Sequence, residues 1–282
     1  MPSPTTAAPI NVVLSGSGAL YPVHAGGLAA LADYHFDITR LAGVSGGAIV
    51  AAAVASGYKP GPDLNQLILN TLPGPNDLID VAWCPLMGWG IIKGSRIEKE
   101  LNRYFEPTFD DLDIPTKVYA VNVDEKAEFP SNLYTVFGTD ETPETSVAAA
   151  VRASMSIPGV FQPKKIDGHK FVDGGLVANF PSHSFADVST EDQPTIGFHL
   201  RGEQGIEPAD SLPSYVSNMA SIMMANINRR HVAEDIWAKT ILLETDKSSM
   251  DFGYSRDDAR ILMELGYRKV ERQISDITGR IT

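Results

Sequence analysis

The chain has only one cysteine, Cys84, so an intrachain disulfide is excluded and the core alone must hold the fold. Such cysteine usage is typical of a reducing compartment. Cys84 stands in an apolar run over residues 81–87 without a neighbouring base, which favours a packed small side chain over a nucleophile. The six histidines and the acidic residues lack the spacing of zinc or calcium ligands. We therefore expect no metal and no other cofactor.

Positive charge is also scarce, because 23 Lys and Arg residues face 35 Asp and Glu residues, for a net charge of −12. An acidic surface repels phosphate backbones, so we expect no nucleic-acid partner. It equally disfavours a broad electrostatic contact with anionic membranes. If the protein works on lipid, apolar side chains must provide most of the contact.

Long apolar runs are missing, since no stretch reaches the roughly 18 residues that a membrane span needs. Residues 1–9 have neither a basic nor an apolar region, so they predict a flexible lead-in and not a signal peptide. We expect a cytoplasmic protein or one peripheral to a membrane, in transient contact with a membrane or micelle surface. The oligomeric state stays open.

Hydrophobic residues, in contrast, make up 43% of the chain, enough for a sizeable core. Short apolar strands alternate with helices, which predicts a mostly parallel sheet covered on both faces, in a single domain over residues 1–282. Ser95, with Glu98 three residues on, is expected to cap a helix in a capping box. The expected strands are 10–14, 38–42, 117–123, 132–137, 171–172, 195–200 and 240–244. The expected helices are 23–34, 48–56, 63–72, 95–105, 146–154, 213–237 and 256–274.

The segment Gly43–Gly47 matches the pattern G-x-S-x-G, with Ser45 at its centre. A strand precedes it and a helix of small residues follows, as in a nucleophile elbow. Gly43 and Gly47 suit the close approach of strand and helix there, and the helix N-terminus favours a negative charge on the serine. The alternative is a glycine turn whose serine only caps a helix.

A second glycine loop follows the first strand, over residues 15–19. Its exposed amides are suited to an oxyanion hole, with Gly16, Ser17, Gly18 and Ala19 as donors. A dinucleotide-binding loop would need a third glycine where Tyr21 stands, and a Walker loop would need a lysine followed by Ser or Thr. The oxyanion interpretation is favoured because Ser45 lies close downstream.

A base is needed to activate a serine, and Asp173 is the best candidate. It ends an expected strand and precedes Gly174 and Gly175, which form the turn after it and allow close approach to another loop. An aspartate can act as base when the hydroxyl lies against it in a dry site. The alternative is an ordinary Asp-Gly turn.

Taken together, the glycine loop, G-x-S-x-G and Asp-Gly-Gly occur in the order of the patatin-like phospholipases, which this chain resembles over about residues 10–200. The resemblance implies a three-layer α/β/α fold with a central, mostly parallel sheet, completed by residues 201–282. It also implies a lipid or ester substrate, an acyl-serine intermediate, and a Ser45–Asp173 dyad without metal. Further segments similar to the family are Ile92–Gly94, Phe109–Leu112, Val151–Pro163 and Gly175–Pro181.

The chain departs from the family's usual loop, G-G-G-x-R/K-G, at three positions. Ser17 replaces the middle glycine, Leu20 stands where a basic residue is expected, and Tyr21 takes the place of the last glycine. A cation missing from the site would weaken the preference for phosphate-bearing headgroups. On that view, an arginine introduced at position 20 is expected to favour anionic phospholipids over neutral esters.

Two other functions remain open. A Ser-His-Asp esterase would use His199 or His231 as its histidine. A non-catalytic lipid-binding or interaction protein on the same fold would need no activated serine at all.

Residues 78–92 are expected to form a lipid-facing lid, because apolar side chains are interrupted there by Pro85, Gly88 and Gly90. Tryptophans suit a membrane interface. The alternative is that these side chains cover the core. The lid residues singled out are Trp83, Leu86, Met87 and Trp89.

Overall fold

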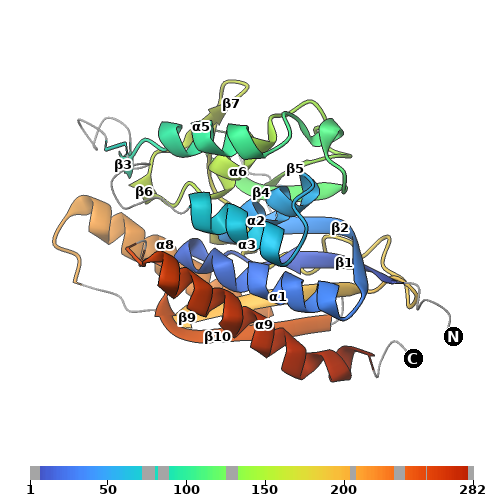
Figure 1. Ribbon diagram of the computed structural model, residues 1–282. Coiled ribbons are helices and arrows are strands. Elements are labelled where there is room, and N and C mark those ends of the chain that lie inside the picture. Colours follow the sequence, from blue (N-terminus) through green and yellow to red (C-terminus); the bar gives the residue numbers. More distant parts are fainter. Residues whose placement is uncertain are drawn as a thin grey trace, which may run out of the picture.

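The computed structural model describes residues 7–71, 80–81, 89–124, 133–203, 208–231, 239–251 and 253–278. Residues 1–6 of the expected lead-in, Cys84, and Trp83, Leu86 and Met87 of the expected lid lie outside these ranges. Within them, the chain folds around an eight-stranded sheet with helices packed against it (Figure 1). The expected α/β architecture is confirmed.

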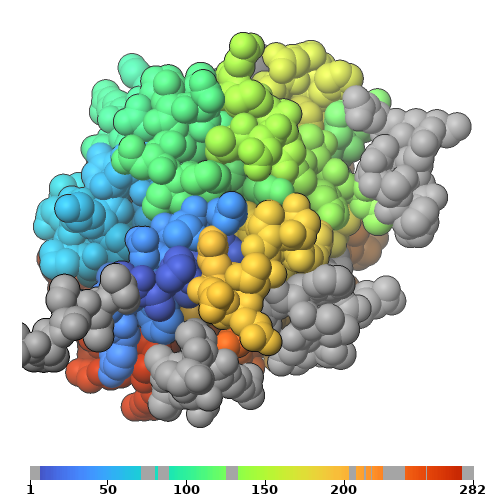
Figure 2. Space-filling model, turned by 90° about the vertical axis from the view of Figure 1, so that its right-hand side faces the viewer, coloured from blue at the N-terminus to red at the C-terminus, as the bar shows by residue number. Residues whose placement is uncertain are grey.

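Five neighbouring strands of the sheet are parallel, in the order β10-β9-β1-β2-β4. Figure 2 shows the end of the molecule at which β1 begins, beside the gold segment that precedes β9. There the amide of Asn11 donates to the carbonyl of Pro194 at 3.0 Å. These strands are β1 (Ala8–Leu14), β2 (Phe36–Val44), β4 (Thr116–Asn122), β9 (Thr195–Glu203) and β10 (Lys239–Ser248).

The remaining strands of this sheet are antiparallel, which the sequence did not indicate, whereas a separate two-stranded sheet is parallel. β5 (Thr135–Gly138) and β8 (His169–Asp173) both pair with β4, and β7 (Lys164–Ile166) forms a hairpin with β8. The hairpin turns at Asp167 and Gly168, both at positive φ, as tight turns require. A separate pair joins β3 (Gly90–Ile92) to β6 (Gly159–Phe161), so part of the expected lid is a strand.

Helices cover the sheet, as Figure 1 shows for α1, α2, α3 and α9. Helix α9 packs along α1, so the C-terminal part of the chain shares a core with the motif-bearing part. The helices are α1 (Tyr21–Asp33), α2 (Gly46–Ala55), α3 (Pro62–Thr71), α5 (Ser95–Tyr104), α6 (Val147–Ser154), α7 (Gly175–Ala178), α8 (Leu212–His231) and α9 (Arg256–Thr278). Short 3₁₀ turns lie at Gly18–Leu20 and Phe109–Asp111.

Each face of the sheet has its own buried cluster, because successive strand residues point to opposite sides. On β1, Val12 and Leu14 join the large cluster under the helices, whereas Val13 faces the other side. There it packs with Phe180 and Phe185, which follow α7. The second face is thus covered largely by the segment after Asp173.

Helix α5 is capped differently from the prediction. Its N-cap is Gly94, in the left-handed region at φ 74°, and Ser95 is the first helical residue. The carboxylate of Asp80 accepts hydrogen bonds from the amides of Gly94 and Ser95 at 2.7 and 3.0 Å. Glu98 instead forms an ion pair with Lys164. The predicted capping box is therefore wrong, because a carboxylate from an earlier segment supplies the cap.

Among the described residues, no helix combines the length and the apolar character needed to cross a membrane.

The Asp80 cap can be tested by mutation. We expect Asp80→Ala to lower the free energy of unfolding by about 0.5–2 kcal/mol, the usual cost of a lost helix N-cap. Urea denaturation of both proteins measures the difference. Glu98→Ala is the control, since a partly exposed ion pair contributes about 1 kcal/mol or less. A larger loss for Glu98→Ala than for Asp80→Ala would contradict this assignment.

Candidate active site

Ser45 lies in a sharp turn between β2 and α2, at φ 50° and ψ −121°. A positive φ is uncommon for a residue with a side chain, and it costs about 1–3 kcal/mol unless the surroundings impose it. The flanking glycines allow the turn. A β-carbon on Gly47 would overlap the carbonyl oxygens of Leu14 and Ser15, and one on Gly43 would lie 2.6 Å from the Gly47 carbonyl oxygen. The turn thus has the form of the predicted elbow.

The backbone of Ser45 is held from α6 and β4. Its amide donates to Ser154 Oγ at 2.8 Å, and that hydroxyl donates to the carbonyl of Tyr119 at 2.6 Å. Ser154, fully buried, is thereby both acceptor and donor. This relay connects the elbow with the neighbouring strand and maintains the positive φ of Ser45.

Asp173 is the last residue of β8, and the register of the strands explains its place beside Ser45. Val44, the last residue of β2, pairs with Tyr119 of β4, and the next β4 residue, Ala120, pairs with Asp173. Strands β2 and β8 therefore flank β4 at the same level, and the residue after Val44 comes next to Asp173.

The two side chains meet directly, since Ser45 Oγ donates to Asp173 Oδ2 at 2.7 Å. The second carboxylate oxygen accepts from the amide of Gly175 at 2.7 Å. Gly174 allows this tight turn, because a β-carbon there would overlap the carbonyl oxygen of Tyr119. Ser45 is 5% exposed and Asp173 is fully buried, so the pair lies in a dry environment.

Burial raises the pKa of the Asp173 carboxyl from its ordinary 3.8 to about 7. Hydrogen bonds from Ser45 and Gly175 oppose this rise without cancelling it. An oxygen base works best when its pKa lies close to the working pH. At neutral pH the carboxylate form is therefore both populated and basic.

The loop at residues 15–20 lies beside Ser45, but its amides are not equivalent. The amide of Gly16 donates to the carbonyl of Asn179 and that of Ala19 donates to the carbonyl of Ser249, both at 2.8 Å. A β-carbon on Gly46 would overlap Ser17 Oγ and would lie 3.2 Å from the Gly18 amide nitrogen. Of the four expected donors, Gly16 and Ala19 thus have their amides engaged, whereas Ser17 and Gly18 lie against Gly46, the residue after the nucleophile.

Ser17 Oγ is buried and has no hydrogen-bond partner among the residues that the structure describes. A buried hydroxyl without a partner is costly and is often explained by a functional role. The glycine more usual at this position would carry no such donor.

Leu20 does not face the site. Its side chain is 1% exposed and belongs to the large core cluster. An arginine at position 20 would have to leave this cluster to bring a cation to the site. The expectation that it would favour anionic phospholipids stays a prediction.

The loop is also held by residues far along the chain, which no motif in the sequence indicates. In addition to the Ser249 contact, the hydroxyl of Tyr254 donates to the carbonyl of Ala19 at 2.5 Å. Both residues belong to the segment between β10 and α9. Ala19 is thus fixed through its amide and its carbonyl.

Arg152 is a second residue that the motifs did not identify. It is 2% exposed and donates to the Ser156 hydroxyl and to three backbone carbonyls. Those carbonyls belong to Lys93, Gly94 and Gln162. The carbonyl of Ser156 in turn accepts the amide hydrogen bond of Asp173 at 3.0 Å. Burial lowers the pKa of Arg152 to about 10, so the guanidinium stays charged at neutral pH.

The histidines occupy other places. Buried His24 contacts the Ser15 carbonyl at 2.9 Å, and burial lowers its pKa to about 4. His199 is buried against Phe180, and His183 hydrogen-bonds with Tyr134. The side chain of His231 lies outside the described residues. In the described part of the chain, no three His, Cys, Asp or Glu side chains gather as metal ligands do.

Of the four expected lid residues, Trp89 alone is described. Its side chain is 61% exposed, and Lys170 Nζ lies 4.9 Å from its ring centre. Trp89 therefore does not cover the core.

Comparisons with known proteins bear on the family to which the chain belongs. The model of the patatin-like phospholipases matches residues 12–186. The uncharacterized protein YqhO of Bacillus subtilis (strain 168) is 29% identical over 295 residues, which cover 93% of this chain and 97% of the relative. The uncharacterized protein R571 of Acanthamoeba polyphaga mimivirus is 24% identical, with 94% and 93% covered.

Among solved structures, the fold is similar to that of VipD from Legionella pneumophila, with a TM-score of 0.56 and 15% identity. The match covers 95% of this chain and 67% of VipD. At this identity the similarity concerns the fold alone. Because the family model matches well over half of its residues, this chain belongs to the patatin-like phospholipase family.

Proposed function

We propose that this protein hydrolyses carboxylic esters of phospholipids or related lipids, with Ser45 as nucleophile and Asp173 as base. The observation that carries the proposal is the 2.7 Å hydrogen bond from Ser45 Oγ to the buried carboxylate. Patatin-like proteins are, as a family, hydrolases of lipid esters. The geometry supplies the activated hydroxyl that such chemistry needs.

In the proposed acylation, Asp173 removes the hydroxyl proton of Ser45 as Oγ attacks the ester carbonyl. The carbonyl oxygen becomes an oxyanion. The C–O bond to the leaving alcohol then breaks, and the proton passes from Asp173 to that alcohol. An acyl group remains on Ser45. In deacylation, water gives a proton to Asp173 as its oxygen attacks the acyl carbon. The bond from that carbon to Ser45 Oγ then breaks, the proton passes from Asp173 to Oγ, and the carboxylic acid is released.

We propose that the oxyanion is stabilised by the amides of Ser17 and Gly18, assisted by the Ser17 hydroxyl. The amides of Gly16 and Ala19 contribute by fixing the loop, because each already donates to a carbonyl. The N-terminus of α2, at which Ser45 stands, adds a favourable dipole. Donors that are held in position before reaction need no reorganisation as charge develops, which supports this part of the proposal.

The lipid-facing role of residues 78–92, with Trp83, Leu86, Met87 and Trp89, stays part of this proposal. Exposure of Trp89 and Val81 to solvent is compatible with it. A net charge of −12 favours neutral or zwitterionic lipids over anionic surfaces.

A Ser-His-Asp esterase is the less favoured alternative. In a triad the imidazole stands between serine and carboxylate. Here Ser45 and Asp173 are in direct hydrogen-bond contact, which leaves no room for a ring between them. A non-catalytic lipid-binding protein is the other alternative, and labelling by a fluorophosphonate probe separates it, since only an activated serine reacts.

Ser45→Ala should abolish hydrolysis of a short-chain p-nitrophenyl ester and labelling by the probe. Removal of a nucleophile typically costs several orders of magnitude in kcat. Ser154→Ala is a useful companion, since it removes the acceptor of the Ser45 amide and the donor to the Tyr119 carbonyl but keeps the nucleophile, and should leave measurable turnover. Retention of more than about a tenth of the wild-type rate by Ser45→Ala would refute the nucleophile assignment.

Asp173→Asn should be almost inactive and yet more stable at pH 8. The raised pKa means that folding disfavours the ionised carboxylate. The penalty is absent below about pH 4, grows as the unfolded state ionises, and is complete above about pH 7. An amide of the same shape removes it, which we expect to raise the free energy of unfolding by up to about 4 kcal/mol.

Thermal melts of the wild type and Asp173→Asn at pH 5 and pH 8 measure this. The gap in melting temperature should be wide at pH 8 and narrower at pH 5. A variant that is less stable than the wild type at pH 8 would contradict the raised pKa, whatever its activity.

The pH dependence of kcat/KM should report the same carboxyl. Because Asp173 must be ionised to accept the proton, kcat/KM should rise about tenfold per pH unit below pH 7 and level off above it. His199→Ala and His24→Ala, where folded, should leave the midpoint in place. A midpoint that disappears in one of these variants would favour the triad.

A further inference from the structure

Helix α8 presents an apolar face to solvent. Five large hydrophobic side chains along it are 43–59% exposed. Their spacing of three or four residues places them on one side of the helix. Few soluble proteins leave such a stripe uncovered without an interaction partner. The five are Leu212, Tyr215, Met219, Ile222 and Met223.

The opposite face of α8 packs beside the candidate active site. Ala220 is buried against Ile157 and Phe161, and Met224 packs on the same cluster. Leu176 of α7, the residue after Gly175, belongs to it as well. The helix therefore lies against Ile157 and Phe161, which precede Asp173 in the chain, and against α7, which follows it.

The surroundings of this face are apolar too. In Figure 1, α8 lies with β3 and β6 at the end of the molecule opposite to the start of β1. Trp89, which precedes β3, is 61% exposed, and Ile91, within β3, is 40% exposed. We use "α8 surface" below for the five exposed α8 residues together with Trp89 and Ile91.

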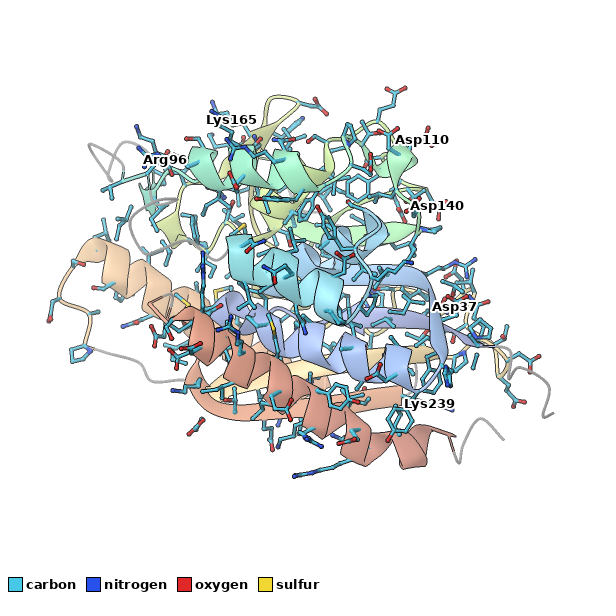
Figure 3. All side chains as sticks on the ribbon, in the orientation of Figure 1. Asp37, Arg96, Asp110, Asp140, Lys165 and Lys239 are labelled. Carbon is cyan, nitrogen blue, oxygen red and sulfur yellow. The ribbon has the colours of Figure 1, made fainter. Side chains whose placement is uncertain are left out.

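Charge distinguishes this surface from the rest of an acidic protein. Residues 212–224 contain no charged side chain, although the chain carries a net charge of −12. The acidic residue nearest in sequence is Asp210, two positions before the helix. Figure 3 shows Asp37, Asp110 and Asp140 on the side of the molecule remote from α8. Beside Trp89 the nearby charge is positive, from Lys170 Nζ at 4.9 Å from the ring centre. A surface without acidic side chains along α8 can approach a zwitterionic membrane without the repulsion that the remaining surface would meet.

We propose that the α8 surface docks on a neutral or zwitterionic lipid bilayer, with α8 lying in the plane of the interface. This proposal rests on the proposed lipid hydrolysis for the biological reason to bind a bilayer. The binding itself requires no catalysis and can be measured separately. An interfacial helix buries its apolar face at the headgroup boundary. Tyr215 and Trp89 are amphipathic side chains suited to that depth. Docking here places the bilayer on the outer side of α8, whose inner side packs with Leu176 of α7, the element that follows Asp173.

The test compares binding to phosphatidylcholine vesicles with turnover of a soluble ester. Met219→Glu/Ile222→Glu should weaken vesicle binding in a sedimentation assay by at least about tenfold, because two charges would enter the interface. Hydrolysis of p-nitrophenyl butyrate should stay within about twofold of the wild type. Rates on vesicles should fall with binding.

Val188→Glu is the matched control. Val188 is 37% exposed and lies in the segment between α7 and β9, whose gold atoms Figure 2 shows at the other end of the molecule. It should bind vesicles as the wild type does.

Three results would overturn the proposal. Unchanged vesicle binding by the double variant excludes the α8 surface. Equal loss on vesicles and on the soluble ester, in a folded variant, makes the surface part of the catalytic site. If the wild type is a dimer and the double variant is a monomer, the surface binds a second copy of the chain.

Ile222→Trp provides an independent check if the charged variant folds poorly. A larger aromatic side chain in the interface should strengthen vesicle binding by about threefold or more, and unchanged binding would again refute the proposal. Failure of the proposed hydrolysis is distinguishable. If the protein has no esterase activity but binds vesicles through α8, the proposed hydrolysis is refuted and the proposed membrane docking stands.

Discussion

The hydrogen bond between Ser45 and a fully buried carboxylate is the constraint on which the rest of this structure depends. A carboxylate in a dry interior is costly and must be held by donors. Asp173 has two, the Ser45 hydroxyl and the Gly175 amide. Both donors exist only because the chain makes tight turns, one at the elbow and one after β8. The unfavourable conformation of Ser45 and the burial of Asp173 are thus stabilised by the remainder of the fold.

The antiparallel edge of the sheet places the base. Strand β8 is antiparallel to β4, so its last residue, Asp173, lies level with the end of β2, where Ser45 follows. The buried guanidinium of Arg152, on α6, joins the β3–α5 connection at Lys93 and Gly94 to Gln162, the residue after β6. The Arg152 guanidinium donates to neutral carbonyl oxygens and forms these bonds without a carboxylate partner among the described residues. No second carboxylate is therefore needed to hold the cation. Arg152 and Asp173 are nevertheless linked through Ser156, whose hydroxyl accepts from the guanidinium and whose carbonyl accepts from the Asp173 amide.

Much of this could be predicted from local patterns. The parallel strands, the elbow and the Asp-Gly-Gly turn each have a signature within a few residues, and the structure brings Ser45 and Asp173 together as those signatures imply. Strand β7 has no such signature, because three residues with two lysines give no alternation. Arg152 was hidden because its partners are mostly backbone atoms, which no motif specifies. The cap on α5 was misassigned because its carboxylate comes from 14 residues upstream.

The hydrogen bonds of Ser249 and Tyr254 to the backbone of Ala19 affect where the boundary of the catalytic domain can be drawn. The matched family region ends at residue 186, so a catalytic module would be drawn there by similarity alone. Yet the glycine loop beside the nucleophile takes part of its shape from the connection between the last strand and the last helix. A fragment with every recognisable motif would keep the nucleophile and the base but leave that loop without its support. In this chain the functional unit is longer than its signature, and the late segment can change the loop during evolution without altering a single motif residue.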